Sequence, residues 1–410
     1  MSQVTGPRRV AFVAPYFTDN ARLFLRHAAA TRDVALCVVS QEDPARLGPE
    51  LRAVVADYER VDDALSSDAI EDAARRLGAR GGAVERLIGI VEQLQEPLGE
   101  ARERLGLPGM RAEVARRFRD KNQMKDLLRA AGVPVARHAQ VATRAAALAF
   151  AAEVGWPLVV KPPAGAASQT TFRVESEVEL DAALGPTSLA AGGVVLLEEF
   201  VTGEEHSFDA FFHDGEVTAY STSDYHPTPL EVMKNPWMQW VVVLPREHEQ
   251  SDVAQAGAAT LRALGMERGM CHLEWFRRKD GTLVVSEVAA RPPGAQFPTM
   301  ISRAHEVDCV GAWAAHQIWD EAPRFPPLRF AVGAAYLRGQ GEGRVRAVHG
   351  LDAVLADLGE LACDVRRPVP GQEKSKSYEG EGFVIVRHPD TSRVREALTR
   401  VISTVRVELS

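Results

Sequence analysis

The chain has few of the features that mark secreted, membrane-spanning or zinc-knuckle proteins. It contains 4 cysteines in 410 residues, and no two of them are spaced as C-x-x-C. This spacing argues against a disulfide framework and a zinc knuckle, so we interpret the cysteines as small buried apolar residues. No apolar run approaches the roughly 20 residues that span a bilayer. The run Val10 to Phe17 is too short for a signal peptide. These absences predict a cytoplasmic protein with no membrane partner.

Long blocks of positive charge are also missing. The 48 Lys and Arg residues are outnumbered by 56 Asp and Glu residues, which gives a formal net charge of −8. The basic run Arg111 to Lys125 is interpreted as a solvated helix, apart from Lys121. This balance argues against a nucleic-acid partner. The 46% hydrophobic and 25% charged composition is that of a globular protein, and the length predicts two or three domains.

The first hundred residues alternate β-rich runs with helical segments, which is the order of a parallel sheet. Strands are predicted at Arg9 to Phe17, Val34 to Ser40 and Arg86 to Val91, and helices at Asn20 to Ala30, Asp68 to Leu77 and Glu92 to Leu105. No G-x-G-x-x-G follows the first strand, so a dinucleotide site is not expected there. Pro108-Gly109 marks the end of this N-terminal α/β domain, which we place at residues 1–110.

Downstream, the pattern changes to helices mixed with antiparallel strands. A helix is predicted over Arg111 to Ala131, and Asp-Gly pairs at 214–215 and 280–281 predict hairpin turns. Further strands are predicted at His138 to Val141, Pro157 to Lys161, Val194 to Val201, Arg329 to Leu337 and Gly382 to Arg387, and helices at Ala145 to Val154 and Arg393 to Val405. The expected fold class is α/β with α+β. We expect a small lobe at 111–190, a central lobe at 191–321 and a C-terminal α+β subdomain at 322–410.

The sharpest chemical signal is a predicted hairpin around residues 271–289. A two-residue turn at Asp280-Gly281 would set Glu274 directly opposite Glu287, and His272 opposite Ala289. Opposed carboxylates repel each other unless a cation lies between them. Mg²⁺ takes one or two such carboxylates and completes its shell with phosphate and water. The pattern predicts a metal site, and the alternative is two unrelated acids on a solvated strand face.

Two other segments suggest nucleotide contacts. Lys161 ends a β-rich run and precedes the small-residue loop Pro162 to Thr171, where backbone amides and hydroxyls can approach phosphate oxygens. This is not a Walker A motif, and a simple turn is the alternative. Further on, Glu205, Ser207 and Asp209 share one face of a strand. An acid at the start of a strand can accept both ribose hydroxyls, although a solvent-facing acidic strand gives the same periodicity.

Taken in chain order, the Lys161 segment, the Glu205 strand and the predicted hairpin at 271–289 resemble the ATP-grasp superfamily. The resemblance covers roughly Arg111 to Asp320 and includes Arg119-Asp120-Lys121, which precedes these three segments. The resemblance implies an ATP-grasp fold preceded by a parallel α/β (pre-ATP-grasp) domain, with ATP and Mg²⁺ as cofactors and Mn²⁺ as the alternative ion. It implies these nucleotide contacts: Lys121, Lys161 and Ser168 with phosphates, Glu198, Glu199 and Val201 in the linker that meets adenine, and Glu205 with ribose.

The resemblance also implies the reacting end of the site. Glu274 and Glu287 match the two acidic Mg²⁺ ligands, and Arg291 matches the arginine that holds the reacting carboxylate or acyl phosphate, so Arg291 and Lys161 are the expected catalytic residues. Ala289 departs from the pattern, because the family usually has an asparagine there that completes the metal shell. His272 or water is expected to fill that place, or a single metal ion binds. The loop Pro162 to Thr171 is expected to close as a lid.

The implied activity is that of a carboxylate-amine ligase of the amino-acid or peptide branch. It forms an amide through an acyl phosphate and releases ADP and phosphate, with a small-molecule carboxylate and an amine as substrates. A homodimer is left open. One alternative is a formate- or bicarbonate-activating enzyme of nucleotide biosynthesis, which the missing Gly-rich first turn disfavours. The other is a non-catalytic nucleotide-binding module, which Ala289 favours and the retained charged residues oppose.

Overall fold

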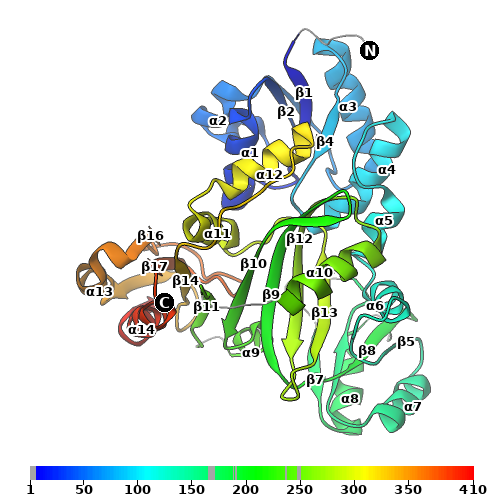
Figure 1. The fold of residues 1–410 in the computed structure, drawn as a ribbon, viewed down its shortest axis with the longest axis vertical. Helices are drawn as coiled ribbons and strands as arrows, with labels where there is room; N and C mark the ends of the chain where they lie inside the picture. Colours follow the sequence, from blue (N-terminus) through cyan, green and yellow to red (C-terminus); the bar gives the residue numbers. More distant parts are fainter. Residues whose placement is uncertain (1–5, 165–170, 188, 190–191, 236–237, 247–250) are drawn as a thin grey trace.

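The computed structural model describes residues 6–164, 171–187, 189, 192–235, 238–246 and 251–410. The strands of this described part form four sheets, of four, eight, two and four strands (Figure 1). The eight-stranded sheet lies in the middle of the molecule. The N-terminal sheet lies at one end of it and the small-lobe sheet at the other, and the C-terminal elements flank its side.

The N-terminal sheet is parallel, in the order β3-β2-β1-β4. Its strands are β1 (Arg8–Val13), β2 (Val34–Ser40), β3 (Asp57–Arg60) and β4 (Arg86–Ile88). Its helices are α1 (Asp19–Ala30), η1 (Pro44–Leu47), α2 (Pro49–Val54), α3 (Ser67–Gly81), η2 (Glu92–Leu94) and α4 (Gln95–Leu105). The predicted parallel α/β order is confirmed, while β3 and α2 were not expected. The first strand ends at Val13 rather than Phe17, since Thr18 already caps α1 by accepting from the Ala21 N–H.

Helices cover both faces of this sheet, which is why its inner strands β1 and β2 are mostly apolar. Ala11 and Val13 face the cluster that includes α3 and α4. On the other face, Phe12 and Phe24 pack edge to face on Trp313 of α12 (Cys309–Trp319), with ring centroids 6.1 and 4.8 Å apart. Figure 1 shows α12 beside α1 on this face. A helix from the segment expected in the central lobe therefore completes the N-terminal core.

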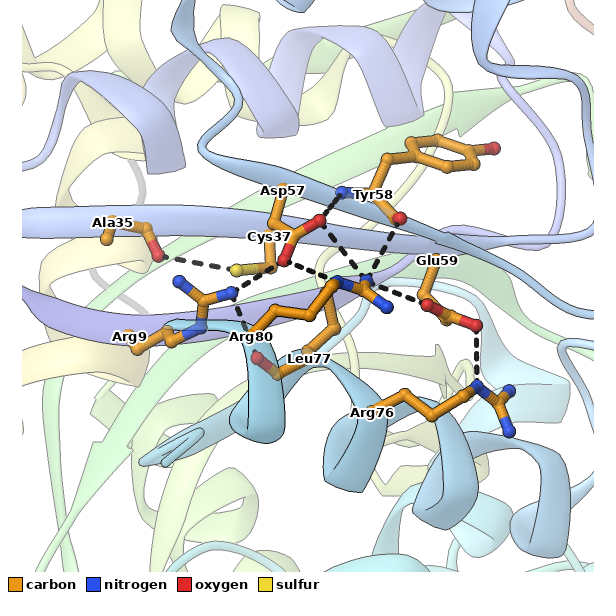
Figure 2. A network of polar contacts seen from close by, with 9 residues as sticks. All are labelled: Arg9, Ala35, Cys37, Asp57, Tyr58, Glu59, Arg76, Leu77 and Arg80. Carbon is orange, nitrogen blue, oxygen red and sulfur yellow. Dashed lines mark hydrogen bonds and ion pairs between the residues drawn. The ribbon is translucent and has the colours of Figure 1, made fainter. Parts of the chain in front are cut away.

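An ion-pair network fastens α3 to the edge strand β3 (Figure 2). The Asp57 carboxylate accepts from Arg9 of β1 at 2.8 Å and from Arg80 of α3 at 3.1 Å. Glu59 lies 2.7 Å from Arg80 and accepts from Arg76 at 2.6 Å. Charge-assisted contacts of this kind stabilise an edge strand that few apolar side chains hold in place.

The predicted helix Arg111 to Ala131 is two helices, α5 (Ala112–Arg117) and α6 (Lys121–Ala130). The chain becomes extended at Asp120, whose carboxylate accepts from the N–H groups of Asn122 and Gln123, both at 2.9 Å, and so caps α6. The expectation of a solvated basic helix is wrong for Lys125, which is fully buried.

The small-lobe sheet is antiparallel, in the order β5-β8-β6-β7. It consists of β5 (His138–Val141), β6 (Leu158–Lys161), β7 (Phe172–Val174) and β8 (Val195–Glu199), with α7 (Arg144–Val154) and α8 (Glu177–Leu184). Its apolar face packs on the two helices and forms a core of its own. Lys161, the last residue of β6, and Glu198 of the neighbouring strand β8 are therefore held on a stable support.

The central sheet runs β13-β12-β9-β10-β11-β14-β17-β16 and crosses the expected boundary at residue 321. Its strands are β9 (Glu204–His213), β10 (Glu216–His226), β11 (Trp240–Leu244), β12 (Arg268–Arg277), β13 (Leu283–Ala289), β14 (Ala331–Leu337), β16 (Ala362–Arg366) and β17 (Gly382–His388). The accompanying elements are α9 (Pro229–Lys234), α10 (Ser251–Leu264), α11 (Phe297–His305), α13 (Leu351–Leu358), η4 (Gly359–Leu361) and α14 (Thr391–Thr404), with β15 (Val345–His349) pairing with β18 (Arg406–Leu409). The expected C-terminal segment thus extends the central sheet.

The two predicted hairpin turns differ. At the first, His213 pairs with Glu216, and Asp214 and Gly215 have φ of 49° and 88°, the values of a two-residue type I′ turn. At the second, Arg278 N–H donates to the Thr282 carbonyl at 2.9 Å, which leaves three residues in the loop rather than two.

A β-bulge at Ser286 compensates for the longer second loop. Trp275 pairs with Val285, but Glu274 pairs with Glu287, so Ser286 is the additional residue. The predicted opposition of Glu274 and Glu287 is therefore correct, although the predicted two-residue turn is wrong.

Three of the four free cysteines, Cys37, Cys271 and Cys309, are buried as expected, whereas Cys363 is half-buried. Among the described helices, none has the length and apolar character needed to cross a membrane.

Candidate functional site

A cleft of about 470 Å³ opens between the small-lobe sheet and the central sheet. It brings together residues from distant parts of the chain, and every described residue of the predicted site lines it. These are Lys121, Lys161, Glu198, Glu199, Val201, Glu205, Glu274, Glu287 and Arg291. Ser168, and with it most of the expected lid loop, lies outside the described residues.

The opposed carboxylates of β12 and β13 form one wall of the cleft. Lys121, at the start of α6, donates to Glu287 Oε1 at 2.6 Å. Burial raises the pKa of Glu287, but the charges of Lys121 and Lys161 outweigh burial and leave this pKa below its ordinary value. Glu287 therefore faces the cleft as a carboxylate at neutral pH.

Glu205 is a third acid beside this pair, and its pKa indicates that negative charge is concentrated here. Burial, and then the carboxylates of Glu274 and Glu231, raise the pKa of Glu205 well above its ordinary value. A cation among these acids would lower that pKa again. The described residues contain no group of three or more His, Cys, Asp or Glu side chains placed to hold a metal ion. A cation at Glu274 and Glu287 would therefore need further oxygen ligands from phosphate or water, which is the usual arrangement for Mg²⁺.

Glu198 lines the cleft and connects two buried lysines, Lys161 and Lys125. Its Oε2 lies 2.9 Å from Lys161 Nζ, and its Oε1 lies 3.3 Å from Lys125 Nζ. Burial lowers the pKa of Lys161, but the charges of Glu198 and Glu287 outweigh burial and raise it. For Lys125, burial dominates and lowers the pKa to about 8. The Glu198 side chain is therefore engaged with the lysines, and it positions the Lys161 ammonium at the cleft surface.

The segment after β8 carries the residues expected to meet adenine. Glu199 N–H donates to the Arg137 carbonyl at 2.9 Å, and the Glu199 carboxylate accepts from Arg137 and Arg278, both at 2.7 Å. These contacts join the small lobe to the tip of the β12–β13 hairpin. They fix the backbone path up to Val201, which lines the cleft.

His272, suggested as a substitute metal ligand, is turned to Asp209. Its Nδ1 lies 2.7 Å from Asp209 Oδ1, and its Nε2 lies 3.6 Å from Glu274 Oε1. Burial lowers the pKa of His272, but Asp209 outweighs burial and raises it to about 9. As arranged here, the imidazole is a cation between two carboxylates.

Arg291 follows β13 and meets Glu92, the first residue of η2 in the N-terminal domain. Its Nε and a terminal nitrogen donate to Glu92 Oε2 at 3.4 and 3.3 Å. Arg119 donates to the other Glu92 oxygen at 3.2 Å. Glu92 is buried and lines the same cleft, so the N-terminal domain contributes directly to the site.

Sequence reasoning missed Lys125 and Glu92. The first had a readable signal: Lys125 lies four residues after Lys121, on the helix face that carries the buried Met124 and Leu128. Glu92 had no such signal, because its contact with Arg291 spans 199 residues of sequence.

Residues 154–299 match the family described as ATP-grasp domain, a range that contains Lys161, Glu274, Glu287 and Arg291. The L-arginine-specific L-amino acid ligase of Bacillus subtilis is 26% identical over 233 residues, which are 55% of this chain and 56% of that protein. The uncharacterized protein y4rH of Sinorhizobium fredii is 25% identical over 351 residues, 84% of this chain and 72% of that protein.

The fold has a full-length counterpart. The crystal structure of L-amino acid ligase from Bacillus licheniformis aligns with a TM-score of 0.77 at 17% identity, over 99% of this chain and 100% of that one. Together, the family match shows an ATP-grasp domain at residues 154–299, and the structural alignment shows that the whole chain shares its fold with that L-amino acid ligase.

Proposed function

We propose that the protein is an ATP-dependent ligase that activates a carboxylate as an acyl phosphate and joins it to an amine. One observation carries this proposal: two buried lysines, an opposed pair of carboxylates and an arginine converge on a single cleft from α6, β6, β12, β13 and the loop after β13. Small molecules are the substrates in this proposal, and the four free cysteines suit a cytoplasmic setting.

ATP would lie along the cleft from the linker after β8 to the opposed carboxylates. The backbone at Glu199 and Val201 would meet adenine, and Glu205 would accept ribose hydroxyls. Lys121 and Lys161 would neutralise charge on the phosphates as it builds during transfer. The existing contacts of these lysines with Glu287 and Glu198 hold both ammonium groups in position.

Glu274 and Glu287 would hold Mg²⁺, or Mn²⁺ as the alternative, since opposed carboxylates and a raised Glu205 pKa fit a divalent cation. When bound, such an ion neutralises phosphate charge and orients the transferred group. Arg291 offers a planar fork of donors that suits a carboxylate or an acyl phosphate. The substrate carboxylate oxygen attacks the γ-phosphorus of ATP and ADP leaves. The amine then attacks the acyl carbon, and phosphate leaves as the amide forms.

The decisive test measures the products of turnover with a panel of amino acids, each with and without a second amine. We expect amine-dependent release of ADP and phosphate. Pyrophosphate and AMP would contradict acyl phosphate formation, since they indicate adenylation. Release of ADP with bicarbonate or formate, but with no amino acid, would support a nucleotide-biosynthesis enzyme instead. ATP binding without any product would support a non-catalytic module.

A further inference from the structure

Aromatic side chains from four segments gather at one end of the cleft. They are Tyr225 at the end of β10, Trp240 at the start of β11, Phe297 at the start of α11, and Tyr378 before β17. Tyr225 packs edge to face on Trp240 and on Phe297, with centroids 5.8 and 6.2 Å apart. Trp240 packs edge to face on Tyr378 at 4.6 Å. Together these four residues are called the aromatic wall.

The aromatic wall lies next to the reacting end of the site. Phe297 packs on His272 with ring centroids 5.6 Å apart, and His272 is 3.6 Å from the Glu274 carboxylate. Tyr378 lines the same cleft as Arg291 and Glu274. A group held by Arg291 therefore has an apolar surface within reach.

The space in front of the wall is open and its rim is fixed. A methyl group built at Gly294, which lines the cleft, would meet no atom within 4 Å beyond its chain neighbours. The next residue, Ala295, accepts a hydrogen bond at its carbonyl from the Tyr336 hydroxyl. Tyr336 also stacks on Trp240 at 4.7 Å, so the rim and the wall form one packed unit. The opening is therefore part of a rigid surface that folding alone leaves unfilled.

One polar group in the wall lacks a partner. Trp240 is 1% exposed, and its indole N–H makes no hydrogen bond with any described residue. A buried N–H without an acceptor costs about 1–3 kcal/mol, and buried tryptophans usually find one. This N–H is itself enclosed by the packed rings, so a molecule in the cleft meets the apolar surface of the wall and not this donor.

We propose that the aromatic wall binds the side chain of the carboxylate substrate, and that this substrate is an amino acid with a large apolar side chain, such as phenylalanine, tyrosine or leucine. This rests on the proposed ligase function. An ammonium cage is the competing interpretation, since acids also line the cleft. However, the rings of the wall pack edge to face on one another, and Trp240 stacks on Tyr336, so they do not surround an open centre.

The test separates acid recognition from amine recognition by using hydroxylamine, which converts acyl phosphates to hydroxamates. Phenylalanine, tyrosine and leucine should give at least tenfold higher kcat/KM than alanine, serine, aspartate or lysine. Preference for a small or charged acid would overturn the aromatic-wall proposal while leaving the ligase function standing. Titration of the Mg²⁺- and ADP-loaded protein with phenylalanine or alanine tests the wall without turnover. If no acid yields hydroxamate, the proposed ligase function is wrong. If phenylalanine and alanine bind equally, or neither binds, the proposal that the aromatic wall binds the substrate side chain is wrong as well.

A graded series at Gly294 supplies the matched control. Its φ lies outside the left-handed region, so side chains are tolerated there. Gly294→Ala should weaken phenylalanine binding a few-fold, and Gly294→Leu should weaken it at least tenfold, while both variants bind ADP and alanine as the parent does. A misfolded variant would lose ADP and both amino acids alike, and circular dichroism would detect it. Equal weakening of alanine and phenylalanine by folded Gly294→Leu would overturn the proposal.

Discussion

A single lysine shows how burial and charge compete beneath the proposed phosphate site. Lys125 Nζ donates to the Ser286 carbonyl at 2.8 Å and lies 3.3 Å from Glu198, with no exposed surface. The carbonyl it binds belongs to the β-bulge of β13. Lys125 therefore connects α6, the small lobe and the β12–β13 hairpin through one ammonium group.

Lys125→Met should flatten the dependence of stability on pH in the alkaline range. The pKa of Lys125 falls from an ordinary 10.5 to about 8 in the folded protein because it is buried. Between these values the unfolded chain binds the extra proton, so Lys125 makes the parent's free energy of unfolding rise with pH. Below pH 8 both states hold the proton and this slope is absent. Urea unfolding of parent and variant across this range checks it. A parent-minus-variant difference that stays constant or falls with pH would contradict the prediction.

The two carboxylates of the hairpin should respond differently to neutralisation. Repulsion alone predicts that either Gln variant is as stable as the parent. The 2.6 Å contact with Lys121 changes this for Glu287→Gln, which should lower the free energy of unfolding by about 1–3 kcal/mol. Glu274→Gln should be neutral or stabilising, because Glu274 helps raise the pKa of Glu205. Chemical denaturation at neutral pH distinguishes the variants, and equal stabilities would argue against this difference.

The contribution of Glu287 to the free energy of unfolding is lost at acid pH. Its folded pKa is below the ordinary 4.5, so the contribution is complete above that value and is lost as pH falls through the folded pKa.

The effect of Mg²⁺ on thermal stability tests the proposed metal site. ATP with Mg²⁺ should raise the parent's Tm more than ATP with chelator, and both Gln variants should lose that difference. A parent-like Mg²⁺ response in both variants would exclude the proposed metal site.

At the scale of an element, α3 and β3 depend on charge as much as on apolar packing. Asp57→Asn would remove the carboxylate that Arg9 and Arg80 share (Figure 2). We expect a loss of about 1–2 kcal/mol of stability at neutral pH. Burial raises the pKa of Asp57, but its hydrogen bonds, first that from Arg80, outweigh burial and lower it. The loss should therefore shrink as pH falls below the ordinary 3.8 towards the folded pKa. Asp62→Asn, a nearby exposed acid, is the control, and an equal effect in both variants would contradict a role for the network.

At the scale of the whole molecule, the N-terminal sheet and the ATP-grasp body share Arg291. Glu92 occupies the donors that a substrate carboxylate would need. Glu92→Gln should therefore lower KM for the carboxylate substrate by about two- to tenfold, since a neutral amide competes less strongly for a guanidinium. Steady-state kinetics with the acid varied checks this, with Glu85→Gln, a salt-bridge partner of Arg8, as the control. A raised KM would mean that Glu92 positions Arg291 instead of competing for it.

Sequence reasoning succeeded where a local pattern fixes the outcome. Alternation placed Glu274 and Glu287 on one face, and the parallel order of the first domain followed from its alternating elements. The length of the loop between β12 and β13 could not be predicted. A two-residue turn, and a three-residue loop followed by a β-bulge, both place Glu274 opposite Glu287. The aromatic wall was also out of reach, since Trp240 and Tyr378 meet only after the chain has passed through five further strands.

The position of Trp313 has a consequence for how the protein is made. The ribosome completes β1 and α1 long before α12, so Phe12 of β1 and Phe24 of α1 are synthesised without the helix that covers them. At 5–20 residues per second, the roughly 200 residues between the first sheet and α12 take on the order of 10–40 s to emerge. Throughout that interval the nascent chain presents an aromatic surface to its surroundings. Chaperone demand should therefore be concentrated in this early stage of translation, and truncations that end before α12 should aggregate.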